Sequence, residues 1–300
     1  MARLAVIVMP VLLSVISPQA GRAQSISQIE TLIQQSTRLY GEGKLAEATP
    51  LAKRAYETSK QLLGESDPLT IVGAHNLAWL YHNQRQLADA EPLYQFALKG
   101  YERGQGKDHP ETLTVVNRMA SLYRQLNRLG EATALYERAL EGYKRALGEE
   151  HPRALAGIHN VAVLYSDQGR IGEAVELHRR ALAARERVLG REHRDTIISA
   201  SALGALYLKQ SRYSEAEPLL NRAAQSYERL LGKEHSETLT NVNDLAALYK
   251  AQRRYNDAEP LYKRVLGARE RALGPDHPST FASIGQLVAL YHEQNRYSEA

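Results

Sequence analysis

Five of the ten histidines recur in one context, each three residues after a glycine. They are His109, His151, His193, His235 and His277. Imidazole binds metal ions and transfers protons near neutral pH, so a row of histidines is a candidate for either chemistry. Donors to one zinc ion lie within about 4 Å of each other, whereas neighbouring helices pack roughly 8–10 Å apart. Histidines from neighbouring repeats therefore cannot easily share a metal ion.

A structural role explains the same five histidines. In the first copy of the context the position is taken by Asp67. Aspartate is a preferred helix N-cap, because its oxygen accepts a hydrogen bond from a free amide of the first turn. A neutral imidazole nitrogen can accept the same bond. We therefore predict helix caps here, and we predict no metal ion and no cofactor. The other histidines show no ligand spacing: His75, His82, His159, His178 and His292.

The sequence contains no motif of a common catalytic class. HExxH and GxSxG are missing, and the chain has no cysteine that could serve as nucleophile or form a disulfide. The stretch Gly41 to Lys44 (GEGK) is similar to part of a phosphate-binding loop. However, Leu45 follows where serine or threonine is required, and helical patterns flank the stretch. We predict a protein that is not an enzyme.

A period of 42 residues, which contains these junctions, runs along the chain. The repeated glycines are Gly64, Gly106, Gly148, Gly190, Gly232 and Gly274. The repeated tyrosines are Tyr81, Tyr123, Tyr165, Tyr207, Tyr249 and Tyr291. The repeated alanines are Ala48, Ala90, Ala132, Ala174, Ala216, Ala258 and Ala300. Three residue types held in register indicate a tandem-repeat protein.

Each repeat carries two helical patterns. Leu77, Leu80 and Tyr81 share one helix face, and a second apolar stripe follows after the turn at residues 83–86. One such hairpin cannot bury its apolar face alone, so neighbouring hairpins must stack. The sequence predicts an all-α solenoid of tandem helical hairpins that curls into a superhelix. The small alanine lets the two helices of a hairpin approach closely.

Glycine and proline positions predict the helix ends. The repeated glycine should end the second helix as a left-handed cap. Prolines should then start the next first helix at Pro68, Pro110, Pro152 and Pro278. A proline inside a helix costs about 3 kcal/mol. Because Pro92 lies two residues after Ala90, we expect the second helix to begin near Ala88. The related prolines are Pro50, Pro218 and Pro260.

The stretch NLAWLYHNQRQLADAEPLYQFAL, residues 76–98, resembles a tetratricopeptide repeat. Its 42-residue period, NLAxLY core, EAEPLY start and LGxxHP junction are similar to the kinesin light chain subtype, here of an exported bacterial type. The resemblance covers residues 26–300. The first repeat departs from it at Arg38, and its turn is expected to be one residue shorter. Two junctions have Arg194 and Ser236 instead of proline. The expected repeats are 26–67, 68–109, 110–151, 152–193, 194–235, 236–277 and a partial 278–300.

The N-terminus resembles a secretory signal peptide. Arg3 precedes a 13-residue apolar run from Leu4 to Ile16, which is too short to span a membrane comfortably. Small residues precede a cleavage site after Ala23. We therefore predict a signal peptide at 1–23, a bacterial periplasmic or secreted protein, and no stable membrane span after cleavage. The alternative is a short uncleaved anchor. The net charge of +4 is too small to indicate a nucleic-acid partner.

The resemblance implies a peptide-binding groove lined by the first helix of each hairpin. Its asparagine, Asn76 in this stretch, clamps peptide backbones in the family, but other residues replace it in most repeats. Trp79 is expected in the groove, with burial as the alternative. The predicted peptide-binding residues are His75, Asn76, Trp79, Asn83, Asn117, Arg118, Arg124, His159, Asn160, Asn243 and Asp244. Groove positions also include His82. The alternative for the whole face is a solvated surface without a ligand.

A row of basic residues follows the first helices, each with an acidic residue three positions later. It comprises Lys44, Arg128, Arg170, Arg212, Arg254 and Arg296. This row could bind an anionic partner. The favoured alternative is structural, because the charges suit helix ends and can pair with each other.

Together these features predict a non-catalytic scaffold that binds protein or peptide partners through its concave first-helix face. The alternative is the regulatory or sensing array of a larger exported enzyme, such as a CHAT-type peptidase. We also expect the apolar face of the last first helix, in the partial repeat 278–300, to be uncovered, because a second helix would only be starting at Ala300. Self-association through that end is a third candidate.

Overall fold

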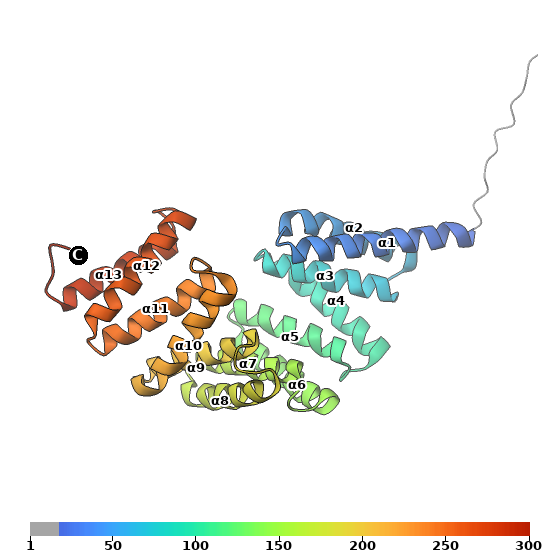
Figure 1. The fold of residues 1–300 in the computed structure, drawn as a ribbon. Coiled ribbons are helices and arrows are strands. Elements are labelled where there is room, and N and C mark those ends of the chain that lie inside the picture. Colours follow the sequence, from blue (N-terminus) through green and yellow to red (C-terminus); the bar gives the residue numbers. More distant parts are fainter. Residues whose placement is uncertain (1–17) are drawn as a thin grey trace, which may run out of the picture. The chain divides into compact units, whose positions relative to one another are not determined.

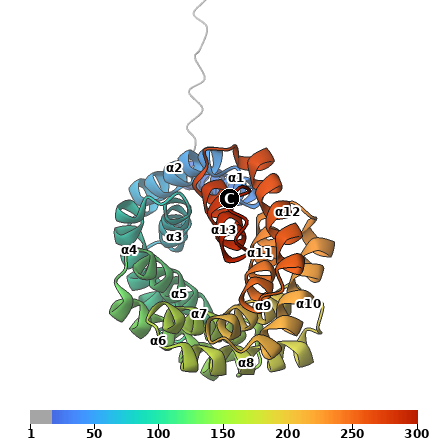
Figure 2. The same cartoon turned by 90° about the vertical axis from the view of Figure 1, so that its left-hand side faces the viewer.

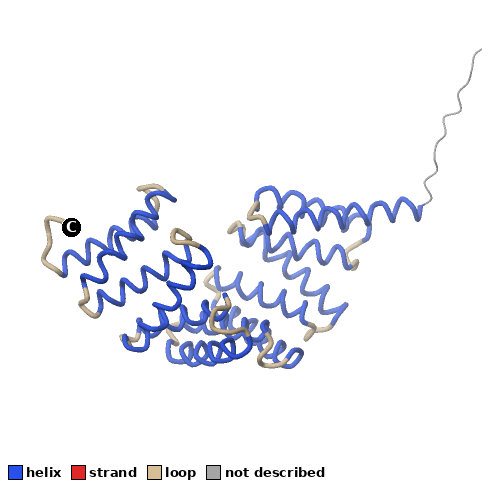
Figure 3. The backbone as a smooth tube through the Cα atoms, in the orientation of Figure 1, coloured by secondary structure: helices blue, strands red, loops and turns tan. Residues whose placement is uncertain are grey.

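The computed structural model describes residues 18–300, with side chains from residue 23 onward. This part of the chain consists of thirteen α-helices joined by short loops, without a β-strand (Figure 1; Figure 3). None of these described helices is long and apolar enough to cross a membrane. The helices are α1 Pro18–Gly41, α2 Leu45–Leu63, α3 Pro68–Asn83, α4 Leu87–Gln105, α5 Pro110–Gln125, α6 Leu129–Leu147, α7 Pro152–Asp167, α8 Ile171–Val188, α9 Arg194–Lys209, α10 Tyr213–Leu231, α11 Ser236–Ala251, α12 Tyr255–Leu273 and α13 Pro278–Glu293. The predicted fold of tandem helical hairpins is confirmed.

The chain forms two compact units. Unit 1 ends at Leu126 and contains α1–α5, and unit 2 starts at Asn127 and contains α6–α13. We call the odd-numbered helices A and the even-numbered helices B, because each hairpin has one of each. Within unit 2, α7, α9, α11 and α13 lie on one side, and α8, α10 and α12 lie on the other (Figure 2). Each unit therefore presents a helix-A face and a helix-B face.

The repeated alanines lie where helices meet. In unit 1, Ala48 packs with Leu77 and Leu80, and in unit 2 Ala216 packs with Leu203. Six of these alanines are fully buried, at 0% exposure: Ala48, Ala90, Ala132, Ala174, Ala216 and Ala258. A larger side chain there would push the helices apart. The predicted role of these alanines is confirmed.

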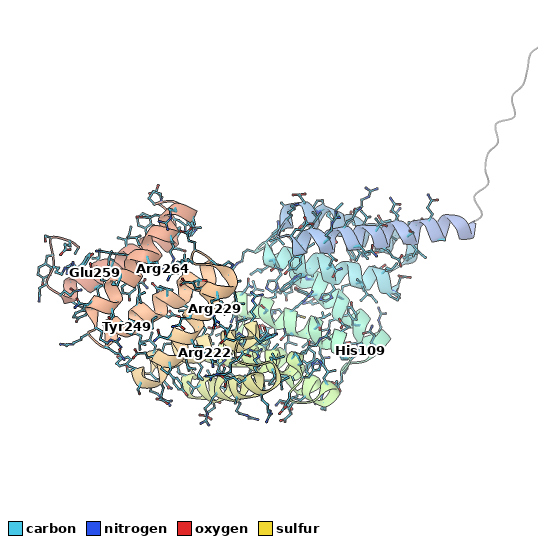
Figure 4. The ribbon with its side chains drawn as sticks, viewed as in Figure 1. His109, Arg222, Arg229, Tyr249, Glu259 and Arg264 are labelled. Atoms are coloured by element: carbon cyan, nitrogen blue, oxygen red, sulfur yellow. The ribbon has the colours of Figure 1, made fainter. Side chains whose placement is uncertain are left out.

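The junction histidines cap the A helices. In each of the five, Nδ1 accepts a hydrogen bond from the backbone amide two residues later, at 3.1–3.2 Å. His109 is one of them (Figure 4). In the first copy Asp67 Oδ1 accepts from the amide of Leu69 at 2.9 Å. Helices α9 and α11 begin at the same place although proline is replaced by Arg194 and Ser236. The predicted caps are confirmed.

The predicted left-handed glycine cap is correct in its positive φ but wrong in its ψ. Gly64 has a φ of 90° but a ψ of 170°, and Gly106 has 92° and 163°. These angles lie in an extended region at positive φ that is open almost only to glycine. With these angles the chain changes direction after helix B and leads directly to the N-cap residue of the next helix A. The sequence predicted a glycine-only position but not its conformation.

The predicted start of helix B near Ala88 is confirmed within one residue, because α4 begins at Leu87. The expected place of the proline in the first turn is wrong: α2 begins at Leu45, so Pro50 is its sixth residue and lies beyond the first turn, where one interior hydrogen bond is lost. The first A–B turn is not shorter than the others, because α1 ends at Gly41 and α2 starts at Leu45, as in the next hairpin 42 residues later. This turn needs one residue at positive φ. The residues that meet this need are Gly43, Arg85, Asn127, Gly169, Ser211, Arg253 and Asn295.

The two chain ends bear on predictions that remain open. Most of the predicted signal peptide lies outside the described residues, and residues 18–23 belong to α1. In α13, Phe281 is 57% exposed, whereas its repeat equivalent Leu239 is 4% exposed. An uncovered apolar face on α13 was expected, and this placement agrees with it. Export and self-association stay predictions.

Candidate peptide-binding surface

In unit 1, the predicted groove residues gather around a small cavity on the helix-A face. Asn76 and Trp79 come from α3, Arg118 from α5 and Tyr40 from α1, and they line a hollow of about 170 Å³. The Arg118 guanidinium lies 4.4 Å from the centre of the Trp79 ring. The rings of Tyr40 and Trp79 meet edge to face at 6.1 Å. An aromatic wall with a cation over it suits an extended peptide that carries an apolar or acidic side chain.

Trp79 is neither fully exposed nor part of the core. It is half-buried, with Tyr40 on one side and the His82 ring at 5.5 Å on another. The two alternatives for this tryptophan are therefore both met in part. One part of the indole packs against unit 1, and another lines the cavity.

His75 lies beneath the groove surface. Only 6% of it is exposed, so the expectation that it faces an open groove is wrong. Its Nε2 lies 2.9 Å from Nη1 of Arg118. A guanidinium can only donate, so Nε2 accepts and the proton of the neutral ring is assigned to Nδ1. Burial, with Arg118 nearby, lowers the pKa of His75 to about 3. His75 thus positions Arg118.

His82, at another expected groove position, is also buried, with 2% exposure. Its Nδ1 lies 3.3 Å from the Tyr94 hydroxyl, and its Nε2 lies 2.8 Å from Nε2 of Gln125. Burial, with Arg118 and Arg85 nearby, lowers the pKa of His82 to about 4. Helical spacing placed both histidines on the right helix. It could not show that Tyr94 and Tyr101 of α4 cover them.

Three other predicted residues of unit 1 lie at the rim of this face. Asn83 is exposed at the end of α3, where its Nδ2 donates to the carbonyl of Trp79 at 2.6 Å. Asn117 and Arg124 are half-buried on α5. The Asn83 side-chain amide is therefore already engaged with a backbone carbonyl in the last turn of α3. The structure brings Asn76, Trp79 and Arg118 together, and a role of the rim residues in peptide binding stays a prediction.

In unit 2, His159 and Asn160 are half-buried on α7. The His159 ring packs edge to face against His178 of α8, with ring centres 5.1 Å apart. His178 is 1% exposed, and burial lowers its pKa to about 3, with smaller contributions from His159 and Arg185. His159 therefore has one side in helix packing, which sequence spacing did not indicate.

Asn243 and Asp244 lie next to each other on α11. The Asn243 Oδ1 atom is buried, and it has no hydrogen-bond partner among the described residues. The same holds for Oε1 of Gln286, the repeat equivalent of Asp244 on α13. Burial raises the pKa of Asp244 to about 6, although Lys209 opposes the shift. These acceptor oxygens would gain stability from an N–H donor, and a peptide backbone supplies such donors.

The basic row at the A–B turns is engaged within the fold. The Arg170 guanidinium lies 3.6 Å from the centre of the Tyr165 ring and donates to Glu173 at 2.6 and 2.7 Å. The bond from Arg170 holds the pKa of Glu173 below its usual range. Arg212, Arg254 and Arg296 repeat this arrangement. The observed pairing agrees with the structural alternative for this row.

Comparison with known families finds a tetratricopeptide repeat model that matches six overlapping segments. These segments are residues 28–103, 80–145, 111–187, 153–229, 196–271 and 236–300. No curated protein matches the chain. The matches tile nearly all the described residues with the same repeat that the 42-residue period predicts.

Among solved structures, a putative kinesin light chain from Podosopora anserina with nearly identical TPR-like repeats is 24% identical over 68% of this chain and 96% of that chain, with a TM-score of 0.59. The quorum sensor NprR in complex with its cognate peptide NprX is 15% identical over 90% of this chain and 73% of that chain, with a TM-score of 0.60. A STAND protein with a tetratricopeptide repeat sensor from Pyrococcus horikoshii is 16% identical over 92% of this chain and 41% of that chain, with a TM-score of 0.67. At such identities the likeness shows a shared fold.

Proposed function

This chain belongs to the tetratricopeptide repeat family, and we propose that it is a non-catalytic scaffold that binds extended segments of a partner protein through the helix-A faces of its units. One observation carries the proposal. In unit 1, Asn76, Trp79 and Arg118 converge from two A helices on one small cavity. The arrangement offers an amide, an aromatic wall and a cation, which are groups for binding and not for bond cleavage.

The chemistry of this face fits a peptide in extended conformation. An asparagine side chain both donates and accepts, so Asn76 can pair with a peptide amide without reading the side-chain sequence. In unit 2, the buried oxygen of Asn243 gains a partner if a backbone N–H approaches. Among the fold neighbours, NprR is known in complex with its peptide NprX. That neighbour supports peptide binding as a use of this fold.

The test requires an identified partner. We would capture proteins from an extract of the source cells with the full chain, identify one, purify it and measure its affinity directly. Replacing Asn76, Trp79 and Asn160 with alanine should weaken binding by at least tenfold while helicity is unchanged. The control variant Lys53→Ala changes an exposed residue of α2 and should bind normally. If the triple variant binds as tightly as the wild type, the helix-A face is not the binding site.

A second candidate is the sensing array of a larger protein. It is favoured by the STAND neighbour, in which a tetratricopeptide repeat sensor is one part and which this chain covers to only 41%. A catalytic domain such as a CHAT-type peptidase would then follow the array. Reading the coding sequence beyond codon 300 distinguishes the candidates. A stop codon within about one further helix would remove this one.

We further propose that the protein is exported. Cleavage after Ala23 would remove the first six residues of α1, from Pro18 to Ala23. The α1 residues that pack into unit 1 come after the cleavage site: Ser25 and Ile26 are half-buried, and Ile29 is the first that is fully buried, at 0% exposure. Cleavage is therefore compatible with the packing. Fractionation and N-terminal sequencing should find a mature chain that starts at Gln24, and an intact Met1 in the cytoplasm would contradict export.

A further inference from the structure

A second cavity, of about 420 Å³, lies in the hairpin of α3 and α4, close to the end of α4. Ile71, Val72 and Tyr101 form its apolar walls, and its lining also includes Ser66 and Arg103. It lies entirely within unit 1 and shares no lining residue with the smaller cavity around Trp79. This second cavity is therefore separate from the proposed peptide groove.

The hairpin of α9 and α10 shows what fills the same place elsewhere in the chain. Three repeats later, Ile197 and Tyr227 stand where Ile71 and Tyr101 stand, and they pack with Ile198 and Leu231. The α4 equivalent of Leu231 is Gln105, whose side chain is exposed. Val72 likewise replaces the larger Ile198, and Gly104 replaces Leu230, whose side chain is 54% exposed in α10. The cavity thus exists where a leucine and other bulk of the repeat are missing.

The same hairpin has also lost an ion-pair partner. In unit 2, Arg229, labelled in Figure 4, pairs with Glu192. Ser226 donates to that glutamate at 3.3 Å. The equivalent pairs Arg187–Glu150 and Arg271–Glu234 occur in the neighbouring hairpins. The arginine is retained as Arg103 in the second hairpin.

The residues around Arg103 explain why no carboxylate reaches it from the usual place. Ser66 stands where the other repeats have glutamate or aspartate, and Gly100 stands where α10 has Ser226. The neighbouring carboxylate, Glu65, pairs with Lys60 at 2.9 Å instead. Arg103 therefore borders the cavity as an exposed cation. Compared with the other repeats, the hairpin of α3 and α4 therefore lacks both a leucine and a carboxylate at the border of this cavity.

We propose that a partner protein docks at this cavity with an internal segment that places a leucine side chain between Ile71 and Tyr101 and a glutamate on Arg103. The leucine would take the position that Leu231 has in α10, and burial of its apolar surface favours binding. The glutamate would take the position of Glu192, with two parallel hydrogen bonds available to a guanidinium. The chain's own sister hairpin thus defines the chemistry of the partner.

The test uses a variant in which the cavity is filled from within. Ser66→Glu combined with Gln105→Leu restores the residues of the other repeats, so the variant should fold with an unchanged or higher Tm. Random peptides, displayed inside a loop of a carrier protein so that no terminal carboxylate is free, are selected on the wild-type chain and counter-selected on this variant. Selected peptides should contain leucine near glutamate or aspartate, and bind wild type at least tenfold tighter.

Several results would overturn the proposal. These are that no peptide is enriched over the filled variant, that enriched peptides lack the leucine or the acidic residue, or that binding requires a free C-terminal carboxylate. Concentration-dependent dimerisation of the wild type that the filled variant abolishes would show that a second copy is the occupant, and would also overturn it. The Tm of both proteins, measured alongside, shows that each is folded when its binding is compared.

The reverse variant makes the test independent of the folding of unit 1. Glu192→Ser with Ile198→Val, Ser226→Gly, Leu230→Gly and Leu231→Gln reproduces the lining of the α3–α4 cavity, apart from Pro68, in unit 2. The selected peptides should then bind at two sites instead of one. If these peptides still bound at a single site, the use of the α9–α10 hairpin as a guide to the occupant of the cavity would be wrong. Binding of these peptides should be unaffected by Asn76→Ala and Trp79→Ala. The peptide-groove proposal can therefore fail while this one holds, and the reverse is equally true.

Discussion

The hairpins of unit 1 and the last hairpins of unit 2 are held to their neighbours by different chemistry, while Thr133 in α6 of unit 2 keeps a neutral contact, its hydroxyl accepting from Gln168 at 2.9 Å. In unit 2, ion pairs link successive hairpins in two rows, for example Arg264–Glu228 at 2.8 Å and Arg254–Glu217 at 2.8 Å, and a third row such as Arg271–Glu234 at 2.6 Å ties helix B to the junction before its own helix A. Arg222, labelled in Figure 4, pairs with Glu186 and repeats the first row one hairpin earlier. The partners in these rows lie 36 or 37 residues apart.

Unit 1 uses neutral or aromatic contacts at the same repeat positions. Phe96 takes the position of Arg222, and the Lys60 ammonium lies 5.9 Å from its ring centre. Thr49 takes the position of Glu217, and its hydroxyl accepts from Gln84 at 2.9 Å. Beneath its helix-A face, unit 1 adds two buried neutral histidines. The repeat determines where neighbours touch, while single residues determine whether the contact responds to salt or to pH.

The largest expected difference between the units is in their response to acid. The pKa of His75 is about 3 and that of His82 about 4, both below the ordinary 6.5 because of burial. Folded unit 1 resists protonation, so its stability is complete above pH 6.5 and falls as the pH drops toward 4. Two such groups lower the free energy of unfolding of unit 1 by about 3 kcal/mol per pH unit within that window. Protection of α3 and α4 should fall by roughly 2–4 kcal/mol between pH 6.5 and 5.

Unit 2 provides the matched control for this acid response. His178 resists protonation in the same way, but Asp244 has its pKa raised to about 6 and binds a proton more readily in the folded state. As the pH falls from 6 to 4, protonation of Asp244 therefore stabilises folded unit 2, while the resistance of His178 to protonation destabilises it. Hydrogen exchange resolved by helix measures both units in one experiment. Equal losses of protection in α3 and α11 would contradict the comparison.

The next largest effect is expected at a pair of equivalent positions. Glu259 accepts from Arg296 at 2.5 Å, Lys263 at 2.7 Å and Tyr291 at 3.2 Å, and the Arg296 bond contributes most to lowering its pKa to about 2. Glu259→Gln should lower the free energy of unfolding of unit 2 by about 1–2 kcal/mol. Thr49→Val, at the equivalent position of unit 1, should cost about 0.5–1 kcal/mol.

Urea unfolding followed by helix-resolved hydrogen exchange would separate the two values. The Glu259 effect should also depend on pH. Because the folded-state pKa is lowered from 4.5, this stabilisation is present above pH 4.5 and disappears as the pH falls toward 2. The Glu259→Gln variant should lose more stability at pH 7 than at pH 3, whereas the Thr49→Val variant should lose the same amount at both. If the loss of the Glu259→Gln variant were also the same at both pH values, the proposed charge contribution would be wrong.

The helix caps should differ less. Asp67→Ala removes a cap carboxylate and should cost about 1–2 kcal/mol, because the charge also interacts favourably with the helix N-terminus. His235→Ala removes a neutral cap with a longer bond, at 3.2 Å, and should cost about 0.5–1 kcal/mol. The exchange Asp67→His keeps an acceptor but loses the charge, so it should cost about 0.5–1 kcal/mol, less than Asp67→Ala. Thermal unfolding of the three variants provides the measurement, and a loss for Asp67→His as large as that for Asp67→Ala would contradict capping by histidine at this position.

Salt should produce the smallest difference. Raising NaCl from 0.1 to 1 M screens exposed ion pairs, each of which contributes only a few tenths of a kcal/mol. Unit 2 should lose a little protection at its Arg–Glu rows, and the interface between Lys60 and Phe96 should change less. Helix-resolved exchange at the two salt concentrations checks this. A larger loss in unit 1 would reverse the assignment of ionic contacts to unit 2.

The amino-acid sequence determined the hairpins, their repeat length and the start of each A helix. These features depend on residues that are close in the chain. Pro68 and Asp67, for example, act on amides within the next turn, so position alone is informative. The sequence also identified the helix that carries Asn76 and Trp79. Its errors at Gly64 and Pro50 concern a torsion angle and the place of a proline within its helix, which neighbouring residues fix only in part.

Only the tertiary structure decided which polar residues are buried and which charges meet. His75 and His82 share a helix with Asn76, yet they are covered because Tyr94 and Tyr101 of the next helix pack beside them. The Arg–Glu rows need partners more than thirty residues away to come within 4 Å. The cavity at Gln105 becomes visible only when the sister hairpin shows what normally fills it. Burial and pairing depend on the neighbour that a helix meets, and only the packed chain supplies that neighbour.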